Sequence, residues 1–193
     1  MAGKRPFLNA QREDDFFYRQ DRELIERLRQ KADREAALHG LSAATGIADR
    51  ELLRELLRLG YEPETGVLLQ LMPLVQVAWS DGSVSEEERK GIFQIATQKG
   101  VENGRALGRL TECLEREPAP ELFRVTLRAL RESHEALPLE ERERRQGELL
   151  MQCMAIASSS GAFLGFGSKI SVAEEFTIKR IAGALEGGRP AEA

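Results

Sequence analysis

The residues best suited to chemistry lie in one short polar segment between two apolar stretches of the chain. Asp81, Ser83, Ser85 and Glu88 all carry oxygen atoms in their side chains. Hard cations such as calcium and magnesium prefer oxygen ligands, and calcium takes about six or more of them. The segment therefore predicts a divalent-cation site. Asp81 and Glu88 would supply charged oxygens, Ser83 and Ser85 neutral ones, and water would fill the remaining positions.

The same segment has a second interpretation as a helix start. Ser85 and Glu88 have the spacing of a capping box, in which the hydroxyl accepts from the Glu88 backbone N–H and the carboxylate reaches back to the Ser85 N–H. Gly82 would end the preceding helix, and the acids after Ser85 favour the positive end of the next. The ligand order of an EF-hand loop is absent. Pure capping and capping combined with cation binding both stay open.

The helix junction occurs twice in the chain. The first copy runs from Val77 to Ala96 and the second from Ile156 to Ala182, where Ser171 and Glu174 repeat the spacing of the capping box. Such an internal repeat indicates a folding unit that is built twice. Because Ser160 stands where the first copy has Asp81, a symmetric pair of metal sites is not expected.

Apolar periodicity predicts helices throughout and no strand. We expect them over about 14–38, 49–60, 64–80, 85–100, 104–116, 121–135, 138–159 and 171–185. His39-Gly40 is expected to end the first helix, and Asp49 to cap the second. The segment 64–80 is the most apolar, which predicts a central buried helix, kinked at Pro73.

The predicted fold class is therefore all-α: an antiparallel helical bundle with an internal pseudo-twofold helix-junction repeat and an N-terminal helical extension. The expected organisation is an N-terminal tail and helical extension over residues 1–62, a helical domain over 63–187 and a flexible tail over 188–193. Trp79, at the end of the central helix, is expected to anchor the core.

Composition narrows the function classes. The formal net charge is -4, which argues against a large field that would attract nucleic acid. No apolar run approaches the roughly 20 residues of a membrane span, and the N-terminus lacks the apolar stretch of a secretory signal. Cys113 and Cys153 have no pairing or metal spacing, so reduced, buried thiols are expected. The sequence thus predicts a cytoplasmic protein.

Enzymatic motifs are missing from the sequence. His39 and His134 have no cysteine or carboxylate at ligand spacing and are expected at the surface or at helix ends. Gly167-Ser168-Lys169 fails the residue order of a phosphate-binding loop. Phe163, Leu164 and Phe166 nearby are expected to pack into the core, with an exposed docking patch as the alternative. A non-enzymatic protein without a cofactor other than a cation is predicted.

The first junction resembles the TerB-like (tellurite resistance TerB) family. The matching residues are Ala78-Trp79-Ser80-Asp81-Gly82, Val84, Glu87-Glu88-Arg89 and Ile92, and Ala157 to Ala182 is similar to the second junction of that family. The resemblance covers about residues 64–186. It implies antiparallel helices with a pseudo-twofold repeat, metal binding at the acidic junction, and a role in bacterial stress or tellurite-linked systems.

Two functions follow as expectations. One is an adaptor or sensor of a stress response that binds a cation, calcium or magnesium, at Asp81 and Glu88, and captures a protein partner. The alternative is an interaction or inhibitor-type protein without a metal site, whose charged N-terminal helix docks on its partner. Phe17 to Arg29 is similar to the helical ATPase inhibitor proteins, which supports this second expectation.

Overall fold

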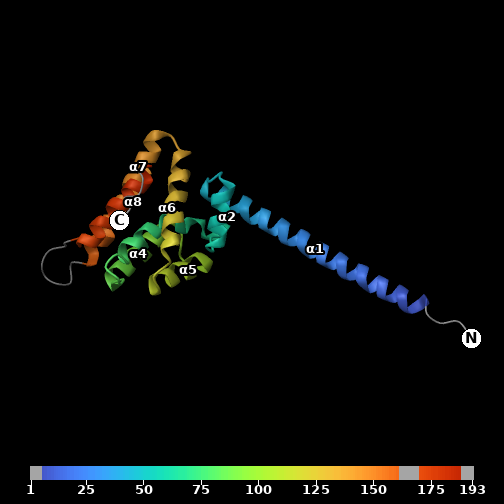
Figure 1. Cartoon of the computed structure of the whole chain (residues 1–193). Helices are drawn as coiled ribbons and strands as arrows, with labels where there is room; N and C mark the ends of the chain where they lie inside the picture. Colours follow the sequence, from blue (N-terminus) through green and yellow to red (C-terminus); the bar gives the residue numbers. More distant parts are fainter. Residues whose placement is uncertain (1–5, 161–169, 188–193) are drawn as a thin grey trace, which may run out of the picture.

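The chain, described by a computed structural model, forms a helical body from which one long helix projects (Figure 1). The structure describes residues 6–160 and 170–187, and the side chains of residues 20–159 and 170–187. Over these two ranges the elements are eight α-helices and one 3-10 helix, without a strand, so the all-α helical bundle is confirmed.

The elements follow one another with short connections. They are α1 (Pro6–Thr45), α2 (Arg50–Arg58), the 3-10 helix η1 (Pro63–Gln70), α3 (Met72–Ala78), α4 (Glu86–Gln98), α5 (Gly104–Glu115), α6 (Pro120–Glu135), α7 (Leu139–Ser160) and α8 (Val172–Leu185). The side chain of Asp49 accepts from the N–H groups of Glu51 and Leu52, which confirms Asp49 as the predicted cap of α2.

One hydrophobic core holds the body together, and it draws on both sides of residue 62. Leu38 and Leu41 of α1 and Leu52 and Leu56 of α2 belong to the same buried cluster as the residues of α3 to α8. The end of α1 and all of α2 are therefore part of the body. The expected division of the chain at residue 62 stays a prediction, and the expected tail, 188–193, lies outside the described residues.

The expected end of the first helix at His39-Gly40 is wrong, because α1 continues to Thr45. The helix also begins earlier than expected, at Pro6. Gly40 instead lets another segment approach closely: a Cβ atom at this position would lie 2.7 Å from Cγ of Pro63. The helix ends before Gly46, which has a φ of +73°. Glycine reaches this conformation without steric cost, as a C-terminal stop requires.

The expected continuous central helix over 64–80 is also wrong. The segment forms η1, then turns at Leu71, and α3 begins at Met72. Pro73 therefore lies in the first turn of a new helix, where its missing N–H leaves no helical hydrogen bond unmade. The prediction that the segment is buried is confirmed, since Leu68, Leu71, Leu74 and Val77 are almost inaccessible to solvent.

The N-terminal part of α1 projects from the body (Figure 1). All side chains from residue 20 to residue 36 are exposed, on every face of the helix. Local contacts along this part include an ion pair between Arg27 and Glu23 and a hydrogen bond from Gln30 to Glu26. Each such surface pair contributes only about 0.2–0.5 kcal/mol. Between residues 20 and 36 the helix therefore has little tertiary support.

Candidate functional site

The first helix junction, residues 79–88, connects α3 to α4. The chain leaves α3 through hydrogen bonds from Ser80 N–H to Val77 O and from Gly82 N–H to Trp79 O, both 3.0 Å long. Gly82 then adopts a φ of +93°, a conformation that side chains rarely allow. This reversal brings the polar residues that follow to the start of α4.

Ser85 and Glu88 form the predicted capping box. Ser85 N–H donates to Oε2 of Glu88 at 2.7 Å, and Glu88 N–H donates to Oγ of Ser85 at 3.2 Å. The hydroxyl of Ser85 also donates to the same carboxylate oxygen at 2.8 Å. Capping is therefore confirmed as a role of these two residues, and it occupies only one of the two oxygens of Glu88.

The second carboxylate oxygen of Glu88 gives the junction its unusual electrostatics. Glu88 is 1% exposed, and its Oε1 is buried without a hydrogen-bond partner among the residues that the structure describes. Burial raises the pKa of Glu88, the hydrogen bonds from Ser85 oppose this shift, and the charges of Asp81 and Glu174 add to it. A positive charge beside Glu88 would offset both the cost of burying the charged carboxylate and its repulsion by the other two acids.

Two further oxygens beside the junction lack partners. Oγ of Ser80 and Oε1 of Gln76, four residues earlier in the chain, are both buried without a hydrogen bond to the described part of the chain. Each buried, unpaired polar group costs roughly 1–3 kcal/mol. The end of α3 and the start of α4 thus carry three unpaired oxygens, in Gln76, Ser80 and Glu88, of the kind that a hard cation or ordered water would satisfy.

Asp81 and Ser83 form a second pair, apart from the capping box. Oδ1 of Asp81 accepts from the backbone N–H of Ser83 at 3.2 Å, and both side chains face solvent. The four predicted ligands thus form two hydrogen-bonded pairs, Asp81 with Ser83 and Ser85 with Glu88. The two pairs interact through the charges of Asp81 and Glu88. Among the described residues it places no three His, Cys, Asp or Glu side chains together in a metal-binding group. The metal role of Asp81, Ser83, Ser85 and Glu88 stays a prediction.

Glu174 was predicted as a capping residue, but its electrostatic interaction with the first junction was not. It is 2% exposed, and Oε2 accepts from the Ser171 backbone N–H at 2.6 Å, so the capping box predicted at the start of α8 is confirmed. Its charge reaches Glu88, which lies far away in the sequence. The repeat of the capping box identified Glu174, but only the packing of α8 against α3 shows that both buried acids face one region.

The first junction is also tied to α5. Trp79 Nε1–H donates to the carbonyl of Cys113 at 2.9 Å, and Nη2 of Arg89 donates to the carbonyl of Leu114 at the same distance. Both carbonyls belong to the last turn of α5, where the helix itself supplies no donors. Trp79 therefore anchors the junction by a hydrogen bond to α5, in addition to packing beside the core.

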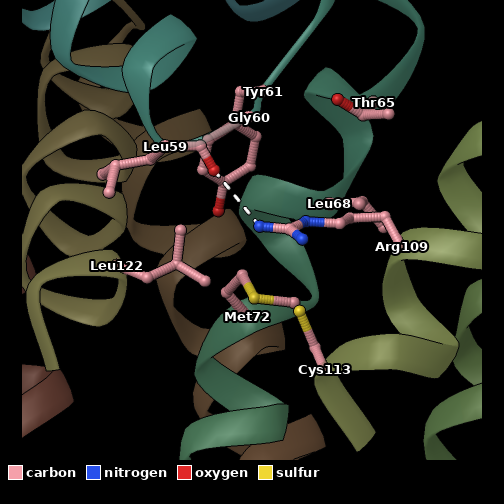
Figure 2. Close-up of a pocket in the computed structure, with 9 residues that line it drawn as sticks. All are labelled: Leu59, Gly60, Tyr61, Thr65, Leu68, Met72, Arg109, Cys113 and Leu122. Carbon is pink, nitrogen blue, oxygen red and sulfur yellow. Dashed lines mark hydrogen bonds between the residues drawn. The ribbon is translucent and has the colours of Figure 1, made fainter. Parts of the chain in front are cut away.

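A small cavity lies between α2, η1, α5 and α6, away from the first junction (Figure 2). Arg109 Nη2 donates to the carbonyl of Leu59 at 3.3 Å, and Tyr61 and Thr126 share a hydrogen bond of 2.7 Å between their hydroxyls. The cavity leaves about 10 Å³ of room, roughly what one water needs. It is too small for an organic substrate.

Both cysteines are buried free thiols, as predicted. Burial raises the pKa of Cys113, and it raises that of Cys153 to about 12. A high pKa leaves little of the nucleophilic thiolate at neutral pH. Neither thiol has the environment of a nucleophile.

The structure separates the two histidines. His39 is exposed on α1 and His134 lies in the last turn of α6, so both occupy the expected surface or helix-end positions. The burial of the His134 side chain was not predicted. The glycine-rich segment Gly161 to Lys169, with the predicted core residues Phe163, Leu164 and Phe166, lies outside the described residues.

Comparison with known proteins gave no match to a family model, a curated protein or a solved structure. The resemblance to the TerB-like family therefore stays a prediction. Among the described helices, none is long and apolar enough to cross a membrane.

Proposed function

We propose that the protein is a non-enzymatic helical adaptor or sensor that binds a divalent cation, calcium or magnesium, at the first helix junction. The observation that carries the proposal is the Oε1 atom of Glu88, which is buried and has no hydrogen-bond partner within residues 6–160 and 170–187. A carboxylate in this state favours either a proton or a metal ion. The negative charges of Asp81 and Glu174 nearby favour an ion over neutral water.

The proposed ligands are Glu88 and Asp81, with Ser83 and Ser85 as neutral donors and water at the remaining positions. Asp81 and Ser83 are exposed, so their side chains can turn toward Glu88 without disturbing the core. Glu174 adds charge from the start of α8. A bound cation would link the end of α3 to the start of α4, and the link to α5 through Trp79 would transmit the change to a docking surface.

The biological setting follows only from the resemblance to TerB-like proteins. Under it, the protein acts in a bacterial stress response linked to tellurite. The net charge and the lack of an apolar run support the further expectation of a cytoplasmic protein that recognises another protein rather than nucleic acid.

The projecting part of α1 supports a second candidate function, docking onto a partner protein. Leu24, Ile25 and Leu28 are large apolar side chains, each about half exposed. An isolated helix of this kind is only marginally stable in water, and most helical stability in proteins comes from packing of an apolar face. A partner that covers these residues would supply that packing. This function needs no metal.

Thermal unfolding of the chelator-treated full chain, with and without calcium or magnesium, tests the cation proposal. A ligand at about 100 times its dissociation constant adds roughly 2.7 kcal/mol, which corresponds to a rise of about 5–10 °C for a chain of this size. We expect the rise to disappear in Glu88→Gln, which keeps the capping box, and to shrink in Asp81→Asn. Glu87→Gln, an exposed acid of the same helical turn, is the matched control.

A rise that survives in Glu88→Gln, or no rise with either ion, would contradict the cation proposal. The docking function has its own test, a deletion of residues 1–36, which ends before the buried Leu38. We expect this variant to keep the melting temperature of the body and to lose capture of the partner. Undiminished capture would exclude α1 as the docking element.

A further inference from the structure

A polar cavity lies at the opposite end of α4 from the first junction. Side chains from four elements line it: Gln70 of η1, Lys99 at the end of α4, His134 of α6, and Arg145, Glu148 and Gln152 of α7. It leaves about 40 Å³ of room. One water needs roughly 10–15 Å³, so the cavity holds several atoms of that size.

His134 is the buried wall of this cavity. The side chain is 4% exposed, and its Nδ1 atom is buried with no hydrogen-bond partner in the two described ranges of the chain. Burial lowers the pKa of His134, and the charges of Arg145 and Arg142 lower it further. The ring is therefore neutral near pH 7, and one of its nitrogens can donate a hydrogen bond into a site that cations surround.

Lys99 brings a positive charge to the cavity and forms no close ion pair with a described residue. Its Nζ donates to Oε1 of Gln70 at 2.9 Å, and among the described residues it makes no ion pair. Burial lowers the pKa of Lys99, whereas the charge of Glu148 raises it and that of Arg145 lowers it. A half-buried ammonium group in this state is stabilised by an anion placed beside it.

Arg145 supplies a second cation, and its two Nη groups are available as hydrogen-bond donors. Its Nε donates to Oε1 of Glu141 at 2.7 Å, while its two Nη groups donate to no other described residue. Glu148 is the one acid of the lining, and its Oε1 already accepts from Nη1 of Arg144 at 2.5 Å. With His134 neutral, the two cations and one acid leave the lining with one net positive charge.

We propose that this cavity binds a small oxyanion, a phosphate-like ion or the carboxylate of a small organic acid. Lys99 and the Nη groups of Arg145 contact its oxygens, the imidazole of His134 donates from the buried side, and the amides of Gln70 and Gln152 complete the site. Two cations and neutral donors around one cavity match the chemistry of an oxyanion, which accepts several charge-assisted hydrogen bonds.

The site is separate from the proposed cation site. Ser85 caps the start of α4 and Lys99 caps its end, with 13 helical residues between them. At a rise of 1.5 Å per residue, the two sites lie roughly 20 Å apart. Lys99 also places its charge at the negative end of α4, where a cation is stabilised. Anion binding here does not depend on a metal at the first junction.

NMR spectroscopy of the histidine rings of the full chain tests the proposal directly. The chain has two histidines, and His39, exposed on α1, is an internal reference. Sodium phosphate and sodium acetate are titrated against sodium chloride at equal ionic strength. We expect saturable shifts of the His134 ring alone, with a rise in its pKa on binding, because a bound anion favours the imidazolium form.

Variants separate a built site from nonspecific ion effects. Loss of one charged donor weakens binding roughly 10- to 100-fold, so we expect this change in the phosphate dissociation constant for Lys99→Met and for Arg145→Gln. Lys179→Met, on the exposed face of α8, removes the same charge and leaves the constant unchanged. Circular dichroism checks that each variant is folded.

Two results would overturn the proposal. One is a cavity filled by water only, in which neither phosphate nor acetate produces a saturable shift of His134. The other is a shift that Lys99→Met and Lys179→Met retain equally, or that His39 shares, which would show a general ionic effect. Saturation by phosphate but not by acetate, or the reverse, supports the site and identifies which kind of oxyanion it accepts.

Discussion

The two helix junctions of this protein share a capping box and differ in what precedes it. At the first, Ser85 N–H donates to Glu88 at 2.7 Å, and at the second, Ser171 N–H donates to Glu174 at 2.6 Å. The return bond from the glutamate N–H is 3.2 Å long at both. Both glutamates are almost completely buried. The capping box thus builds the same helix start twice.

The residues before the capping boxes are not alike. At the first junction α3 ends at Ala78. Trp79 then donates a hydrogen bond to α5, and Asp81 adds a negative charge. At the second, α7 continues from Ala157 to Ser160, and Ser158 and Ser159 bond to carbonyls of their own helix. The difference teaches that the capping box by itself builds a helix start, and that Trp79 and Asp81 set the first junction apart from the second.

The largest expected effect breaks the link to α5. Trp79→Phe removes the hydrogen bond to Cys113 and part of the ring volume, so we expect the free energy of unfolding to fall by about 2–3 kcal/mol. Ser158→Ala, the aligned position of the second junction, is expected to stay within about 0.5 kcal/mol of the parent. Urea unfolding measures both. Equal losses would remove the asymmetry between the junctions.

A smaller effect tests what the junctions share. Ser85→Ala and Ser171→Ala each remove a hydroxyl that accepts at the start of a helix, so we expect each to cost about 1 kcal/mol. The same urea experiment reports the two losses, and Ser85→Thr and Ser171→Thr, which keep a hydroxyl, serve as controls. If only one of the two alanine variants is destabilised, the capping boxes are not equivalent.

The smallest effect concerns the charge of Glu88. Burial, opposed by hydrogen bonds from Ser85 and reinforced by Asp81 and Glu174, raises its pKa above the ordinary value of 4.5. The stability contributed by protonated Glu88 is therefore fully present below the unfolded pKa and lost as the pH rises through the folded pKa. We expect Glu88→Gln to gain stability relative to the parent over that rise, as measured by urea midpoints from about pH 4 to pH 8.

A difference between the parent and Glu88→Gln that stays constant with pH would contradict the raised pKa. The same titration with a divalent cation sharpens the comparison, because a bound cation lowers the pKa of its ligand. We expect the cation to reverse the dependence of stability on pH in the parent and to leave it unchanged in Glu88→Gln. Glu87→Gln, at an exposed position of the same turn, controls for the general loss of one charge.

Local signals were sufficient wherever a residue acts on its own neighbours in the chain. Ser85 with Glu88, Ser171 with Glu174, and Asp49 were all predicted as caps from type and spacing, and all three caps form. Capping is an interaction over three residues, which explains this success. The apolar periodicity likewise predicted the all-α class and most of the helices after residue 80.

Local signals failed where a distant segment decides the conformation. Gly40 has the type and context of a helix stop, yet Pro63 packs against it and the helix continues to Thr45. His134 lies at a helix end, as expected, but its burial was not predicted, because η1, α4 and α7 bring Gln70, Lys99 and Arg145 around it. No pattern within one helix predicts a neighbour from a distant segment, because that contact forms only when the helices pack.

The sequence alone determined the helical class, the two capping boxes and the polar character of the first junction, since each depends on periodicity or on residues a few positions apart. Only the tertiary structure decided that Glu88 is buried with an unpaired oxygen within reach of Glu174, and that Lys99, His134 and Arg145 surround one cavity. These properties depend on burial and on charges brought together from distant helices, and both are set by packing.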